Sequence, residues 1–147
     1  MSSELIQLAL DQARLALALD EVPIGAVIVR GDEIIATGHN RIETTHDPSA
    51  HAEIVALREA STKLGTRHLT DCDLYVTLEP CPMCAQAISF ARIRRLYFGA
   101  YDPKGGGVEH GPRIYEQPTC HHAPEIIGGI MEQECGDLLK SFFQEKR

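Results

Sequence analysis

The sequence predicts an α/β protein with three layers, in which helices cover both faces of a mixed sheet of about five strands. Helical and strand patterns alternate after residue 40, which is typical of parallel strands joined by right-handed crossovers. Before that point a hairpin pairs two strands antiparallel, so the sheet has to be mixed. With 147 residues the chain is long enough to form one domain, residues 1–147, around a sizeable core.

The first part of the chain predicts a helix followed by the hairpin. Polar residues recur at helical spacing over residues 3–19 and leave a broad apolar surface between them. An apolar, β-branched strand is expected at 24–29. Gly31 and Asp32 then form a tight turn into a second strand at 33–37.

The remainder of the chain predicts three helices and three strands. In order, we expect a helix over residues 51–64 closed by Gly65, a strand over 74–78, a helix beginning near Pro82, a strand over 95–99, a short strand over 125–129 and an amphipathic helix over 132–146. The segment 100–124 contains Gly105-Gly106-Gly107 and is long enough to be a functional loop at the rim of a pocket.

Composition and charge limit the classes of protein. The apolar share of 44% and the charged share of 24% are those of a soluble globular protein. No signal-like start or membrane-length apolar run is present, so we expect a cytoplasmic protein without a membrane partner. The net charge of −7 argues against nucleic acid, but residues 1–91 hold 6 basic against 13 acidic residues, whereas 92–147 hold 8 of each. A polyanionic partner would therefore bind to residues 92–147 rather than to residues 1–91.

The residues with the clearest chemistry are His51, Glu53, Cys81 and Cys84. One imidazole and two thiols supply three ligands to a tetrahedral zinc, and a catalytic zinc keeps its fourth position for water. Glu53 follows His51 by two residues and is not needed as a ligand, so it can carry protons between that water and a substrate. The pattern resembles the signature of zinc-dependent nucleobase deaminases.

The other cysteines and histidines allow less specific interpretations. A structural zinc would need a fourth protein ligand, for which Cys72 and Cys120 are the candidates. We expect instead that Cys72 and Cys135 pack as small apolar residues. His121 and His122 fit a loop or a subunit contact better than a second metal site, because adjacent side chains point in different directions on most backbones.

Nearly from end to end, the chain resembles the tRNA-specific adenosine deaminases of bacteria, within the zinc-dependent cytidine and deoxycytidylate deaminase superfamily. The resemblance is carried by residues 21–27, 38–41, 47–53, 75–81, 98–102 and 142–143. It implies a cytidine-deaminase-like fold, one zinc ion per subunit and a homodimer. It also implies hydrolysis of adenosine to inosine at the wobble position of a tRNA anticodon loop.

The same resemblance implies roles for further residues. Asn40 would hydrogen-bond the purine, the Ala52 backbone would recognise the base edge, and Asp102 would lie beside the ribose. Phe142 and Phe143 resemble a tail that grips the anticodon loop. Val27 is a further candidate substrate contact. Apart from the resemblance, we expect phosphates to be met by those basic residues that face the pocket among Arg92, Lys104, Lys140, Lys146 and Arg147.

Several alternatives stay open on the sequence alone. Guanine deaminases share Pro-Cys-Pro-Met-Cys, so a deaminase of guanine or of another free purine or nucleoside is the main rival. A non-catalytic, zinc-stabilised RNA-binding module is the second. Asn40 could simply cap a turn, and of Phe142 and Phe143, both expected on the inward face of the last helix, one could be buried while the other faces a groove.

Overall fold

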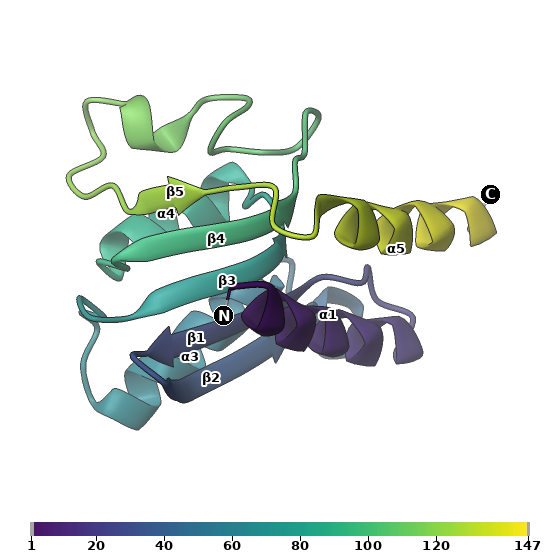
Figure 1. Ribbon diagram of the computed structural model, residues 1–147, viewed down its shortest axis with the longest axis horizontal. Coiled ribbons are helices and arrows are strands. Elements are labelled where there is room, and N and C mark those ends of the chain that lie inside the picture. Colours follow the sequence, from purple (N-terminus) through teal and green to yellow (C-terminus); the bar gives the residue numbers. More distant parts are fainter. Residues whose placement is uncertain (1, 147) are drawn as a thin grey trace.

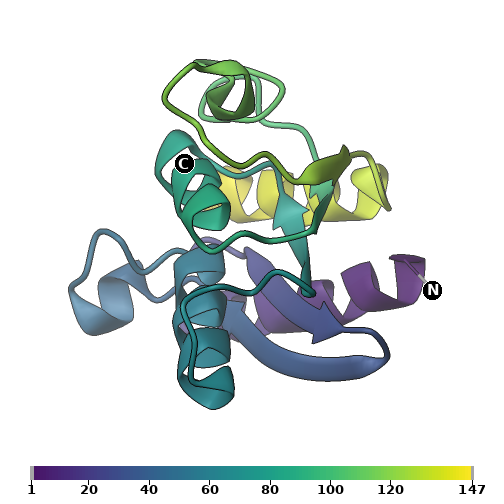
Figure 2. The same ribbon diagram turned by 90° about the vertical axis from the view of Figure 1, so that its left-hand side faces the viewer.

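A five-stranded mixed sheet forms the centre of the protein in the computed structural model, which describes residues 2–146. Its strand order is β2-β1-β3-β4-β5, and helices lie on both faces (Figures 1 and 2). The strands are β1 (Gly25–Arg30), β2 (Glu33–His39), β3 (Asp73–Leu78), β4 (Arg95–Ala100) and β5 (Glu125–Ile127). The predicted three-layer α/β architecture with about five strands is therefore confirmed.

Strand directions divide the sheet into two parts. β1 pairs antiparallel with β2 through the hairpin, and it also pairs antiparallel with β3. β3, β4 and β5 run parallel to one another. The carboxyl ends of β3 and β4 consequently leave the sheet at the same edge, which is where open α/β sheets bind their ligands.

Four longer helices complete the layers. α1 (Ser2–Ala18) and α5 (Glu132–Glu145) cover one face of the sheet, while α3 (Ala52–Leu64) and α4 (Pro82–Phe90) cover the other (Figure 2). Each face has its own apolar core: Ile6 and Leu10 of α1 pack on one side, and Leu57 and Ile88 pack on the other. The sheet therefore separates α5 from α3, which His51 precedes, and from α4, which contains Cys84.

Two short helical segments lie where the sequence predicts only loops. They are α2 (Ile42–Thr45) and the 3-10 turn η1 (Ile114–Glu116). α2 is stabilised by a residue far away in the chain, because the buried Glu21 carboxylate accepts hydrogen bonds from the amides of Glu43 (3.1 Å) and Thr44 (2.6 Å). A helix of four residues makes too few internal hydrogen bonds to be stable by itself, and it is too short for its sequence to show helical spacing.

The core positions expected for the unpaired cysteines are confirmed. Cys72 lies in the core beside α3 and α4, and Cys135 lies in the core beneath α1 and α5. The expectation for the last helix is only half correct, because Phe142 is buried whereas Phe143 is 51% exposed. None of the helices within residues 2–146 combines the length and apolar character needed to cross a membrane.

Candidate active site

The start of α3 and the start of α4 bring the three predicted metal ligands together. His51 is the residue that precedes α3, and Cys81 is the residue that precedes α4. Neither makes the side-chain cap hydrogen bond that is common at these positions. Cys84 lies one turn into α4 and is buried. Both helix starts therefore direct their first side chains to one point, where the positive ends of the helix dipoles favour thiolates.

The spacing of these ligands fits a tetrahedral ion. His51 Nδ1 lies 3.6 Å from Cys81 Sγ and 3.5 Å from Cys84 Sγ. Zinc bonds of about 2.0–2.1 Å to nitrogen and 2.3 Å to sulfur, at a tetrahedral angle, place nitrogen and sulfur about 3.5 Å apart. Within residues 2–146 this is the one cluster of three or more His, Cys, Asp or Glu side chains with such geometry, and it contains no fourth protein ligand.

Glu53 lies beside this cluster in the first turn of α3 and is only 4% exposed. Burial raises the pKa of its carboxyl group to about 7, and the negative charge of Cys81 adds to this, while the positive charge of His51 opposes it. A bound divalent cation would also lower this pKa. Glu53 can thus hold or release a proton near neutral pH, as a general acid and base must.

The two thiols have opposite proton affinities. A hydrogen bond from Cys84 lowers the pKa of Cys81 to about 4, and His51 acts in the same direction. The same bond, together with burial, raises the pKa of Cys84. Cys81 also raises the pKa of His51 by hydrogen bonding. Cys81 and Cys84 therefore share one proton and carry one negative charge between them, which attracts a cation.

Asn40 stabilises the start of α3. Its side chain is 3% exposed, and its Oδ1 accepts a hydrogen bond of 2.8 Å from the Ala52 amide. This contact supplies the cap that His51 does not provide, and it occupies the Ala52 N–H. Contact of Asn40 with a base would consequently use its amide nitrogen, and contact through the Ala52 N–H would require this bond to break.

A second buried glutamate, Glu79, was not among the predicted site residues. Glu79 follows β3 directly and precedes Pro80-Cys81, which we call the metal-binding turn, and its side chain is 0% exposed. Oε1 accepts hydrogen bonds from the Asp102 amide (3.0 Å) and His110 Nδ1 (2.8 Å). Oε2 accepts from the amides of Val108 (3.2 Å), Glu109 (2.9 Å) and His110 (3.1 Å). All five donors belong to the loop that follows β4.

This loop carries Asp102 and Lys104. Asp102 is partly buried, and its carboxylate accepts a hydrogen bond of 3.0 Å from the Gly105 amide. Lys104 is exposed. The Gly107 amide donates to the Pro80 carbonyl over 2.8 Å, next to Cys81. The loop therefore lies directly against the metal-binding turn.

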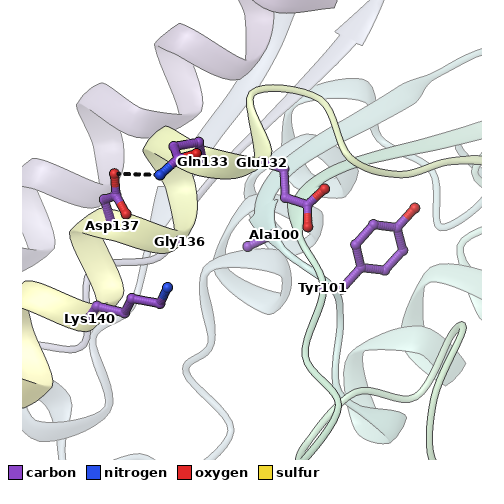
Figure 3. Close-up of a pocket in the computed structure, with 7 residues that line it drawn as sticks. All are labelled: Ala100, Tyr101, Glu132, Gln133, Gly136, Asp137 and Lys140. Carbon is purple, nitrogen blue, oxygen red and sulfur yellow. Dashed lines mark hydrogen bonds between the residues drawn. The ribbon is translucent and has the colours of Figure 1, made fainter.

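A separate hollow of about 450 Å³ lies between the end of β4 and α5 (Figure 3). It is lined by Ala100, Tyr101, Glu132, Gln133, Gly136, Asp137 and Lys140. None of the metal ligands lines it, although Tyr101 is adjacent to Asp102 in the chain. The predicted contact Lys140 is thus an exposed residue at the edge of this polar hollow.

The remaining predicted contacts are widely separated. Val27 is fully buried beneath α1, on the face of the sheet opposite the metal helices, so its side chain offers no surface to a substrate. Lys146 pairs with Asp20 and lies 5.5 Å from the centre of the Phe142 ring, which ties the end of α5 to the end of α1. Arg147 lies outside the described residues.

The histidine pair and Cys120 lie outside the metal cluster. Cys120 Sγ lies 3.2 Å from the His122 carbonyl, and His122 Nε2 donates to the Ile93 carbonyl over 2.7 Å. Arg92 and His121 line a small pocket together with other residues at the far end of α4. These contacts are structural, so the interpretation of His121 and His122 as a loop feature fits better than a second metal site.

An α/β/α protein with an open His-Cys-Cys cluster and a buried glutamate beside it belongs to the class of zinc-dependent hydrolytic deaminases. Comparison with known families agrees, since the cytidine and deoxycytidylate deaminase zinc-binding region matches residues 1–100. The chain belongs to this deaminase family.

Individual relatives are more specific. A tRNA-specific adenosine deaminase of Agrobacterium fabrum is 57% identical over 97% of this chain and 93% of its own length. A structure from a study of A-to-I editing by tRNA:A34 deaminases is 56% identical, covers 92% of this chain and 99% of its own, and has a TM-score of 0.91. A guanine deaminase of Bacillus subtilis is 41% identical, but the match covers 67% of this chain and 63% of its own, with a TM-score of 0.64.

Proposed function

We propose that this protein hydrolyses the wobble adenosine of a tRNA anticodon loop to inosine, with release of ammonia. The observation that carries the proposal is the open three-ligand cluster with the buried Glu53 beside it, in a chain that resembles tRNA adenosine deaminases over nearly its whole length. A non-catalytic metal module is disfavoured, because it would have a fourth protein ligand and no use for Glu53.

One zinc ion per subunit would be held by His51, Cys81 and Cys84. When bound, it supplies Lewis-acid activation of a water molecule. The two cysteines already share one negative charge, which the two helix starts stabilise. The nitrogen–sulfur distances of 3.6 and 3.5 Å fit a tetrahedral ion, so binding requires loss of the Cys84 proton but little movement of the three side chains.

Glu53 would move the protons of the reaction. Its carboxylate accepts a proton from the attacking water and passes it to N1 of the adenine, which makes C6 more electrophilic. After the water oxygen has bonded to C6, Glu53 delivers the second proton to the departing amino group, and the C6–N6 bond breaks. A carboxyl group with a pKa near neutrality is suited to both transfers.

The surrounding residues would bind the flipped nucleotide. A base in a flexible loop leaves its stack at a cost of only a few kcal/mol, which favours an anticodon loop as substrate. The Asn40 amide nitrogen would contact the purine, and the Asp102 carboxylate would contact the ribose. Phe143 on the exposed side of α5 and the neighbouring Lys140 would contact RNA outside the pocket, where an aromatic ring can stack on a base.

We also propose a homodimer in the cytoplasm. α3 and α4 border an apolar groove of about 580 Å³, and Phe90 at its edge is 68% exposed. A second copy of the chain packed on this groove would bury Phe90 beside the metal helices. Phe90→Asp is expected to shift the protein to monomers in sedimentation analysis, and a dimer that survives this change would exclude this surface as the interface.

The test of the function is an assay of purified, zinc-loaded protein on an anticodon stem-loop with a wobble adenosine, alongside free guanine, adenosine and cytidine. We expect inosine from the stem-loop and no ammonia from the free compounds. Guanine deamination without inosine formation would establish the rival activity. Phe143→Ala is expected to weaken stem-loop binding, whereas Leu15→Ala, an equally exposed residue of α1 (52%), serves as the matched control.

A further inference from the structure

The buried carboxylate of Glu79 organises the loop from Tyr101 to His110. Three consecutive amides, those of Val108, Glu109 and His110, converge on one oxygen, and the Asp102 amide binds the other. Converging backbone N–H groups are the usual way in which proteins bind an external anion. Here the anion is a side chain of the protein itself, so the loop is built around Glu79.

Two glycines of this loop are required by its contact with Glu79 and the metal-binding turn. A Cβ atom on Gly106 would lie 2.4 Å from Glu79 Oε2, and one on Gly107 would lie 2.6 Å from the backbone of Pro82. Distances this short would displace the loop. The Gly105-Gly106-Gly107 run thus permits the backbone to approach the carboxylate and the start of α4 closely.

Both oxygens of the carboxylate are satisfied by hydrogen bonds from the loop. A carboxylate whose oxygens together accept five hydrogen bonds has no free position from which to exchange protons with a substrate. Removing it would leave four amide groups without their acceptor in a largely buried place.

We propose that Glu79 is a positioning residue for the RNA substrate: it fixes the loop that carries Asp102 against the turn that carries Cys81. Glu79 precedes Cys81 by two residues, and the Pro80 carbonyl between them binds the Gly107 amide. Hydrogen bonds therefore join the loop that carries the proposed ribose contact to the turn that carries the metal ligand. This inference rests on the proposed function and adds a residue that sets where the nucleotide sugar is held.

The test compares zinc-loaded wild-type enzyme with Glu79→Gln, which keeps the side-chain volume and removes the charged acceptor. We expect KM for the stem-loop to rise roughly tenfold to a hundredfold, with a smaller change in kcat and unchanged zinc content. Hydrogen exchange should accelerate in residues 102–110 while α3 and α4 stay protected. Glu116→Gln, which changes an exposed carboxylate in η1, outside the loop from Tyr101 to His110, is the matched control and should leave KM unchanged.

Gly106→Ala is the second variant, because it displaces the loop from Glu79 without removing any charged group and should raise KM in the same way. Wild-type KM in a folded Glu79→Gln or Gly106→Ala enzyme, despite faster exchange in the loop, would overturn the inference and leave Glu79 as a residue of stability alone. If the wild-type enzyme itself fails to act on the stem-loop, the proposed function is wrong. The exchange experiment would then still test whether Glu79 holds the loop.

Discussion

Glu53 and Glu79 each lie two residues in sequence from a predicted metal ligand and have nearly the same burial, yet they differ in chemistry. Glu53 follows His51 by two residues and is 4% exposed, and Glu79 precedes Cys81 by two residues and is 2% exposed. Burial raises the pKa of Glu53 to about 7, whereas hydrogen bonds from Asp102, His110, Glu109 and Val108 bring that of Glu79 below its ordinary value. The supply of donors, rather than burial, decides which carboxylate can carry a proton.

The largest expected effect is on turnover. Glu53→Gln should lower kcat for the stem-loop by about 10²–10⁴-fold, because the amide cannot accept and return a proton. Zinc content, measured by atomic emission, should stay at the wild-type level, since Glu53 is not a ligand. A variant that keeps wild-type kcat would remove Glu53 from the reaction.

The pH dependence of stability should separate the two carboxylates in metal-free protein. The pKa of folded Glu53 is about 7 against an ordinary 4.5, so the folded state binds more protons, and its contribution to stability is lost as pH rises through this interval. Relative to Glu53→Gln, the free energy of unfolding of the wild type should fall by up to roughly 3 kcal/mol as the pH rises through this interval, as measured by urea titrations.

Glu79 should show the opposite sign. Its folded pKa is lowered, so its contribution is present above its ordinary pKa of 4.5 and is lost as pH falls below it. The difference in free energy of unfolding between wild type and Glu79→Gln should therefore decrease as the pH falls below 4.5. It should not decrease as the pH rises towards 7. A difference that does not change with pH would contradict the ionised state of Glu79.

At neutral pH the two substitutions should differ in their effect on stability. Glu79→Gln is expected to lower the free energy of unfolding by about 2 kcal/mol, because it removes a charged acceptor from buried donors. Glu53→Gln should leave the metal-free protein equally stable or more stable, since it removes a carboxyl group whose ionisation burial opposes. Equal losses in denaturant titrations would refute the contrast between the two sites.

The smallest expected effect concerns Asn40, whose side chain caps the helix that carries Glu53. Asn40→Ala should cost about 1 kcal/mol of stability, because the Ala52 amide loses its acceptor. Asn40→Asp keeps an acceptor oxygen and should retain stability, yet it lacks the amide nitrogen and should raise KM if that group contacts the purine. Calorimetry and steady-state kinetics on the pair distinguish capping from recognition.

The sequence predicts those features whose evidence lies in short motifs. The metal ligands and Glu53 are recognisable because spacing within two helix starts determines where they lie. Glu79 is not recognisable in the same way, since its donors lie 23 to 31 residues further along the chain and are backbone amides, which any residue supplies. The short helix α2 depends likewise on the distant Glu21.

The sequence also does not show which groups a given side chain contacts in the folded protein. Asn40 could be expected to cap a turn or to contact a substrate, and only the fold shows that the Ala52 amide takes its oxygen. Phe142 and Phe143 are both expected as inward residues, but only Phe142 is buried, whereas Phe143 is exposed. In both cases the segments that pack against the residue, and not its local spacing, decide the outcome.

Two helices of this protein begin without a side-chain cap at His51 and Cys81, because those side chains are directed to the metal cluster instead. A zinc ion bound there would join the starts of α3 and α4 and would supply the activation of water. Scarcity of zinc would therefore loosen the same turns that hold Glu53 and Glu79. In a cell short of zinc, the protein would be less stable as well as inactive.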